Sequence, residues 1–308
     1  MIIYQSNKNW LGDLKNLFTS WTMKKVVRST AVVMALTALL AYLHLEVVQV
    51  RYARLDVTIF SLLGVVLSIL LSFRTNTAYD RWWEGRKLWG DLVNHCRNLA
   101  VYIHTAFPAE DKEIRRYLAI RIVNFCIVLK EHLRSSVEMK ELINVSEKEI
   151  EKYASKVHLP SFIAFEITSS IQDVFKAGDI TVADHISIRE HTRALLNITG
   201  ACERIRKTPI PFSYNVYLKL FITVYALCLP FALIPVFGYW SIIMVGFIFF
   251  AFIGLELMAE EIEDPFGLDC NDLPIGDIAH TIRNNVFEIL AVKQVEQEQT
   301  DELYSKIF

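Results

Sequence analysis

Residues 57–73, VTIFSLLGVVLSILLSF, contain no Asp, Glu, Lys or Arg, and RTNTAYDRWWEGRKLWG follows directly as residues 74–90. A helix that spans a bilayer needs roughly 20 apolar residues, with a range of about 17–25. No proline interrupts the two stretches, so we expect one long helix that leaves the membrane near Arg74 and continues into water. Trp and Arg side chains at its exit suit the membrane interface, where aromatic rings and long cationic side chains gather.

Three further runs lack Asp, Glu, Lys and Arg, and with residues 57–73 they form two close pairs. They are residues 29–45, 220–237 and 239–255. The alternative is a set of core helices in a large soluble protein, but two such pairs are hard to bury in 308 residues. The chain is 53% hydrophobic, with a mean hydropathy of +0.31. We therefore predict an all-α multi-pass membrane protein with four transmembrane helices.

Basic residues near the ends of these runs predict the orientation in a cell membrane. They precede the first and third runs and follow the second, whereas the loop of the first hairpin carries only Arg51 and Arg54, partly offset by Glu46 and Asp56. Because positively charged flanks stay in the cytoplasm, both termini are expected there. The start of the chain has no apolar signal segment, so the first internal run is expected to direct insertion.

The sequence divides into four predicted parts of one unit. Charged residues between apolar ones at helical spacing predict a helical cytoplasmic region, with helices over 111–133 and 187–205 and breaks near 160–161 and 177–179. Pro230 and Pro235 predict a kink or an interruption of the third span. The parts are an N-terminal segment with the first hairpin (1–73), cytoplasmic helices (74–212), the second hairpin (213–258) and an acidic segment with the tail (259–308).

Three motifs in the chain resemble the bestrophin family, including its bacterial members. The first is the FRTNTAYDRWWEGRKLWG run over residues 73–90, and the second is PIPFSY over residues 209–214. The third is EEIEDPFG over residues 260–267, continuing to NDLP at 271–274. The motifs lie in the family's order and bracket nearly the whole chain. The resemblance implies a homopentameric ion channel around a central pore, with membrane lipid and permeant monovalent ions as its partners.

The resemblance also implies that the second transmembrane helix lines a narrow neck at Val65, Ile69 and Phe73. Their i, i+4, i+8 spacing places the three residues on one helix face. Five such faces would form a hydrophobic constriction that gates by dewetting. The alternative for such a triplet is contact with lipid or with the core of the protein. Small residues on the same helix, Gly64 and Ser68, would let neighbouring helices approach closely.

A second constriction is implied at the cytoplasmic exit, near Ala183. The family usually carries a larger apolar residue at this position, so Ala183 departs from its pattern. Either the exit is wider here, or Ile180 or Ile186 forms the ring.

Six carboxylates follow the fourth span within residues 260–272. Oxygen ligands in a tight turn suit Ca²⁺, and the resemblance implies a calcium site at Glu261, Asp264, Asp269 and Asp272. The alternative is a solvated acidic helix end that pairs with Arg74, Arg81 or Arg86. No cofactor is expected to be required, and calcium is the one ion that the pattern suggests.

Other classes of function have less support from the sequence. The histidines form no HExxH pattern, and no phosphate-binding loop or nucleophile elbow occurs, so we do not expect an enzyme. A net charge of −2 and five scattered cysteines indicate neither a nucleic-acid partner nor a zinc motif. A secondary transporter or a membrane assembly protein remains as an alternative. Family likeness favours chloride and other anions, and a sodium-selective channel is the alternative.

Overall fold

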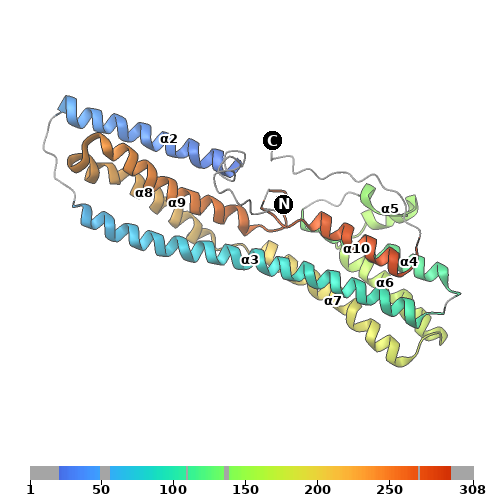
Figure 1. Ribbon diagram of the computed structural model, residues 1–308. Helices are drawn as coiled ribbons and strands as arrows, with labels where there is room; N and C mark the ends of the chain where they lie inside the picture. Colours follow the sequence, from blue (N-terminus) through green and yellow to red (C-terminus); the bar gives the residue numbers. More distant parts are fainter. Residues whose placement is uncertain (1–20, 49–55, 109, 135–138, 270, 293–308) are drawn as a thin grey trace, which may run out of the picture. The chain divides into compact units, whose positions relative to one another are not determined.

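The computed structural model describes residues 21–48, 56–108, 110–134, 139–269 and 271–292 (Figure 1). Every regular element in these ranges is a helix. Residues 49–55 of the predicted loop of the first hairpin, with Arg51 and Arg54, lie outside them, as do the extreme N-terminus and the polar tail. The main helices are α2 (Trp21–Tyr42), α3 (Val57–Ala106), α4 (Lys112–Leu133), α5 (Glu147–Ala154), α6 (Leu159–Ala177), α7 (Val182–Lys207), α8 (Phe212–Phe237), α9 (Ser241–Glu263) and α10 (Ile275–Ile289).

The chain forms two compact units, and each is built from segments that are distant in the sequence. Of the described residues, one unit contains those up to Trp82 together with Pro209–Asp272, and the other contains Trp83–Thr208 and residues 273–292. The predicted part 259–308 is therefore divided, since α10 packs against α4 in the second unit. We refer to the two as the apolar unit and the polar unit.

The apolar unit contains all four predicted spanning runs, which lie on α2, the first part of α3, α8 and α9. Three continuous helical stretches in the described chain are long and apolar enough to cross a membrane: Thr22–Val47, Val57–Ala106 and Phe212–Glu263. The third of these stretches is a hairpin, because α8 and α9 pack against each other around the short turn Gly238–Trp240. Helix α8 continues through Pro230 and Pro235, so the predicted interruption is not seen.

Helix α2 packs along α9 at a point where α9 has no side chain. A Cβ added to Gly246 would lie 2.6 Å from the Cγ atom of Met34 on α2. Glycine therefore allows the two helices to approach closely, as small residues commonly do between spanning helices.

In the polar unit, α4 lies against α6, α7 and α10, and α6 packs along α7. The two ends of the α6–α7 turn are fixed by their own sequence. Gly178 closes α6 in the left-handed conformation, with φ of 86°. Thr181 begins α7 with a capping box, in which its hydroxyl accepts from the Asp184 N–H and the Asp184 carboxylate accepts from the Thr181 N–H. The predicted break at 177–179 is thus a helix end.

Candidate pore-lining helix and its supports

Helix α3 has two faces with different surroundings inside the apolar unit. Leu67 and Leu71 are fully buried. Val65, Ile69 and Phe73 are 58%, 52% and 63% exposed. One face of this helix therefore packs against the rest of the chain, and the three predicted neck residues lie together on the face that the chain leaves uncovered.

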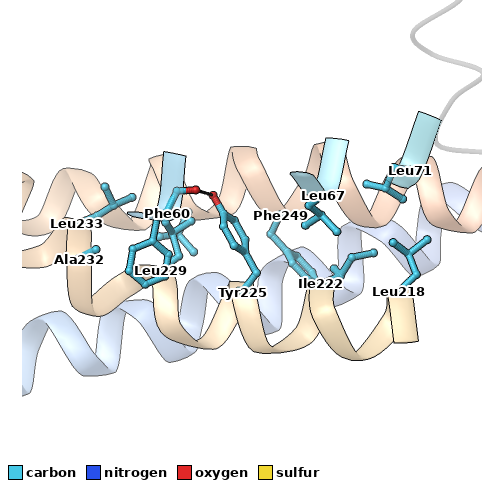
Figure 2. Packing of buried hydrophobic residues seen from close by; sticks show 12 residues of the cluster. Phe60, Leu67, Leu71, Leu218, Ile222, Tyr225, Leu229, Ala232, Leu233 and Phe249 are labelled. Atoms are coloured by element: carbon cyan, nitrogen blue, oxygen red, sulfur yellow. Dashed lines mark hydrogen bonds between the residues drawn. The ribbon is translucent and has the colours of Figure 1, made fainter. Parts of the chain in front are cut away.

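Two tyrosines of α8 attach to the backbone of α3. The Tyr225 hydroxyl donates to the carbonyl of Phe60 at 3.2 Å, and the Tyr214 hydroxyl donates to the carbonyl of Leu70 at 2.8 Å. Figure 2 shows the first of these bonds among the buried apolar side chains of α3, α8 and α9. Directional bonds to a helix backbone fix its rotation as well as its distance. They therefore help to determine which face of α3 stays exposed.

Gly64 lies directly against Tyr225. A Cβ at this position would lie 3.0 Å from the Tyr225 hydroxyl oxygen. The glycine therefore leaves room for the hydroxyl to reach α3, which gives a physical role to one of the two small residues noted in the sequence.

We expect Gly64→Ala to destabilise the protein and to do so less in a Tyr225→Phe background. Tyr225→Phe alone should lower the free energy of unfolding by about 1 kcal/mol, the usual net value of one hydrogen bond. A double-mutant cycle on thermal unfolding in detergent measures the coupling. Strictly additive effects would contradict the close contact, and Thr223→Val, which removes an exposed hydroxyl of α8 bonded to its own helix, is the control.

Arg74 follows the neck residues and is 1% exposed. Its Nη2 donates to Glu263 Oε2 at 2.6 Å, and its Nε lies 3.8 Å from Glu256 Oε2. A buried guanidinium needs such partners, because an unpaired charge away from water is strongly unfavourable. The ion pairs join α3, directly after the neck residues, to the last part of α9.

Glu263 brings together the three motifs that resemble the bestrophin family. Its carboxylate binds Arg74 from the first motif and accepts from the backbone N–H of Ile210 in the second at 2.8 Å. The carbonyl of Glu263 accepts from Arg81 Nε at 3.1 Å. Farther along, Trp82 Nε1 donates to the carbonyl of Asn271 at 2.9 Å. The three motifs thus form one hydrogen-bonded cluster, which lies directly after the exposed neck residues of α3.

The four predicted calcium ligands differ in their surroundings. Glu261 accepts from the Thr22 hydroxyl at 2.5 Å and from Asn271 Nδ2 at 3.0 Å, whereas Asp264 is exposed. Asp272 is buried, and its Oδ2 accepts from the Asp269 N–H at 2.6 Å. Burial, together with the charges of Asp269, Asp264 and Glu261, raises the pKa of Asp272 to about 7, against the opposing effect of the Asp269 N–H.

These residues fit a calcium ion only in part. Asp272 Oδ1 is a buried oxygen without a hydrogen-bond partner among the described residues, so it could serve as a ligand. Across the described chain, however, the four carboxylates form no group of three whose ligand atoms lie within 4.8 Å of one another. Ca²⁺ takes six to eight oxygen ligands, so no step of the function is derived through calcium. Glu263 instead agrees with the alternative to a calcium site, because it is an acidic residue at the end of α9 and pairs with Arg74.

The candidate exit residues separate at the turn before α7. Ile180 is 6% exposed, whereas Ile186 is 64% exposed and Ala183 is also exposed. Within one chain, Ile180 belongs to the core of the polar unit, and of the three candidates Ala183 and Ile186 are exposed, as is the neighbouring Val182. The ring at the exit stays a prediction.

Sequence reasoning gave no role to Tyr214, Tyr225 or Glu256. A tyrosine in an apolar span and a glutamate directly after one are the signals that could have identified them, because each brings a polar group into a costly place. Their partners on α3 come from distant parts of the chain, so the contacts themselves could not be read from spacing.

The fold and these supports define a class: an all-helical protein whose membrane-spanning helices, α3 among them, carry exposed apolar faces. Residues 1–288 match the model of the family described as "Bacterial/Fungal Bestrophin protein". The chain belongs to the bestrophin family.

Relatives of known name support the same assignment. The chain is 37% identical over 235 residues to the voltage-dependent anion channel-forming protein alr2987 of Nostoc, covering 74% of this chain and 76% of that protein. It is 28% identical to the voltage-dependent anion channel-forming protein YneE of Escherichia coli K12, covering 91% and 89%. A bacterial bestrophin homologue from Klebsiella pneumoniae has a similar crystal structure, with a TM-score of 0.81 and 27% identity over 87% of this chain and 100% of that one. These relatives point to a channel and not to an enzyme.

Proposed function

We propose that five copies of this chain form an anion channel in the cell membrane, with α3 of each copy around a shared central pore. Val65, Ile69 and Phe73 form its hydrophobic neck. The four apolar runs cross the bilayer in contact with lipid, and both termini lie in the cytoplasm. The names of the relatives and the positively charged flanks of the spans support this proposal.

The observation that carries the proposal is the exposed stripe along α3. Its members are exposed positions spaced by three or four residues: Leu62, Val65, Ile69, Phe73, Asn76 and Asp80. A stripe with this spacing stays on one side of a helix and is typical of a seam shared by several helices. Beyond Phe73 the stripe becomes polar, as expected for a surface that faces water.

Lipid contact is the competing explanation of this stripe, and single cysteines distinguish the two. In a background without the five native cysteines, Val65→Cys, Ile69→Cys and Phe73→Cys should react with a charged, membrane-impermeant thiol reagent, and the current should fall. Leu220→Cys is the matched control, because Leu220 is 59% exposed on α8, an apolar helix that this proposal places against lipid and not around the pore. Native mass spectrometry of the purified protein should give five chains. Unreactive neck cysteines or a monomer would remove the proposal.

We propose chloride and other small monovalent anions as the permeant ions. A hydrophobic neck does not choose the sign of the ion, so charges beside it must do so. Asp80 is the second position after Phe73 on the exposed stripe, and its side chain is exposed. Five such carboxylates would repel anions, and this residue is the specific observation that favours the sodium-selective alternative.

Asp80→Asn is expected to raise the ratio of anion to cation permeability. The substitution keeps the size of the side chain and removes five negative charges from the pore wall. The reversal potential under an asymmetric salt gradient should move toward the equilibrium potential of chloride. Asp173→Asn on α6, outside the stripe, is the control. An unchanged reversal potential would place Asp80 away from the ion pathway.

Calcium stays an untested prediction at Glu261, Asp264, Asp269 and Asp272, and we propose that conduction does not require it. Removing calcium with a chelator is expected to leave the open probability unchanged in a planar bilayer. A current that disappears in chelator and returns with Ca²⁺ would contradict this expectation. Asp272→Asn would then test whether the ion acts at the acidic segment, because it removes the charge of the most deeply buried of the four carboxylates.

A further inference from the structure

Three side chains of types that bind metals converge in the polar unit, away from the acidic segment. His132 lies near the end of α4, His158 precedes α6, and Glu203 lies in the last part of α7. One oxygen of Glu203, Oε1, lies 2.5 Å from His132 Nε2 and 2.7 Å from His158 Nε2. Their ligand atoms all lie within 4.8 Å of one another. The three side chains are partly buried, so solvent can still reach them.

The donor set selects a class of ion. Two imidazole nitrogens and one carboxylate suit Zn²⁺ and similar transition-metal ions, whereas Ca²⁺ and Mg²⁺ prefer oxygen ligands alone. We propose that His132, His158 and Glu203 bind a divalent transition-metal ion of the zinc type, with its remaining coordination position open to water.

The Glu203 carboxylate carries the negative charge that such an ion needs. Burial would raise the pKa of Glu203, but the hydrogen bonds from His158 and His132 outweigh it, and the net pKa is lowered. The carboxylate is therefore ionised at neutral pH. Lys207 Nζ lies 3.6 Å from its other oxygen and is largely exposed, so this cation can move away when a metal ion arrives.

Metal binding requires the imidazole proton of His158 to move from Nε2 to Nδ1. Its Nδ1 accepts from the Ser161 N–H at 3.2 Å and so caps α6, which places the proton of the neutral ring on Nε2. A metal ion on Nε2 moves that proton to Nδ1, and the cap is lost. A helix cap contributes much less than a bound zinc ion, so the exchange favours the metal. It also leaves a signature, because the Ser161 N–H loses its acceptor.

The position of the site suggests what the ion does. His158 and Glu203 lie at the end of the α6–α7 pair opposite the α6–α7 turn, after which Ala183 follows at the start of α7, and His132 belongs to α4. A metal ion here would join three helices at the base of this pair. It would thus stabilise the helices that hold the candidate exit residues.

Zinc titration of the metal-stripped, full-length protein in detergent tests the proposal. Calorimetry should give one Zn²⁺ per chain and a higher Tm with zinc. His132→Gln, His158→Gln and Glu203→Gln should each weaken binding at least about 10-fold, since each removes a ligand. His191→Gln is the control, because His191 Nδ1 lies 2.9 Å from His95 Nδ1 in the other close histidine pair. Its affinity should equal that of the wild type.

Hydrogen–deuterium exchange of the wild-type protein gives a test that needs no variant. Zinc should slow exchange in peptides covering residues 128–134 and 200–206 and speed it at the start of α6, where the cap is released. The proposal is overturned if the wild type binds no zinc, if the three ligand variants bind it as tightly as the wild type, or if His191→Gln removes it.

Discussion

Ile69→Ala and Phe73→Ala are expected to raise the single-channel conductance several-fold in planar bilayers. Each substitution removes apolar volume from a face of α3 that the chain leaves exposed, at five places in the proposed ring. A wider and less apolar constriction holds water more readily, so the barrier to ion passage falls. Phe73 should give the larger increase, because its ring is the largest of the three neck side chains.

The buried face of the same helix provides the matched control. Leu67→Ala removes a side chain that is fully buried in the core of the apolar unit (Figure 2). It should lower the free energy of unfolding by about 2–5 kcal/mol, the usual range for such a core truncation. The conductance of the folded fraction should not rise. If Ile69→Ala and Phe73→Ala behaved like Leu67→Ala, α3 would not line the pore.

Arg74→Met is expected to lower the free energy of unfolding by about 3–5 kcal/mol, because it leaves buried carboxylates without their cation. Glu263 would keep only its backbone partner at Ile210, and Glu256 would lose its nearest positive charge. Thermal unfolding of the purified protein in detergent measures the change. Lys219→Met is the control, since its ion pair with Glu260 at 2.9 Å is exposed and should contribute less than about 1 kcal/mol.

Two further variants separate charge from geometry at Arg74. Arg74→Lys keeps the charge but loses the planar fork of the guanidinium, so it should recover only part of the stability. The double variant Arg74→Met/Glu263→Gln should lose less free energy of unfolding than the sum of the two single variants. Glu263→Gln removes the negative charge that Arg74→Met leaves without its cation. If the two losses in free energy of unfolding simply added, the ion pair between Arg74 and Glu263 would contribute little to stability. Arg74 would then act by packing alone.

Much of the architecture followed from local sequence. The absence of charge in four runs placed α2, α3, α8 and α9, and the lack of proline after residue 57 predicted the unbroken α3. Apolar spacing predicted the helices near 111–133 and 187–205, and a family resemblance ordered the motifs along the chain. Apart from the family resemblance, each of these signals lies within one continuous stretch of sequence, which is why they could be read without a structure.

What the sequence did not disclose depends on contacts between distant segments. Pro230 and Pro235 predicted a kink or an interruption, and α8 continues through both without an interruption while packing against α3 and α9. His132 on α4, His158 directly before α6 and Glu203 on α7 have no motif spacing, so only the folded chain brings them together. The packing of α10 against α4 in the polar unit is likewise a contact between distant segments.

The meeting of three motifs at Glu263 has a consequence for how this protein can vary. A residue there must satisfy a guanidinium, a backbone N–H and, through its carbonyl, a second arginine. Single replacements in any one motif will therefore be poorly tolerated, while paired replacements at 74 and 263 will survive more often than their separate effects allow. In a selection for viable variants, substitutions in the three motifs should therefore occur together, although more than 100 residues separate the first motif from the second.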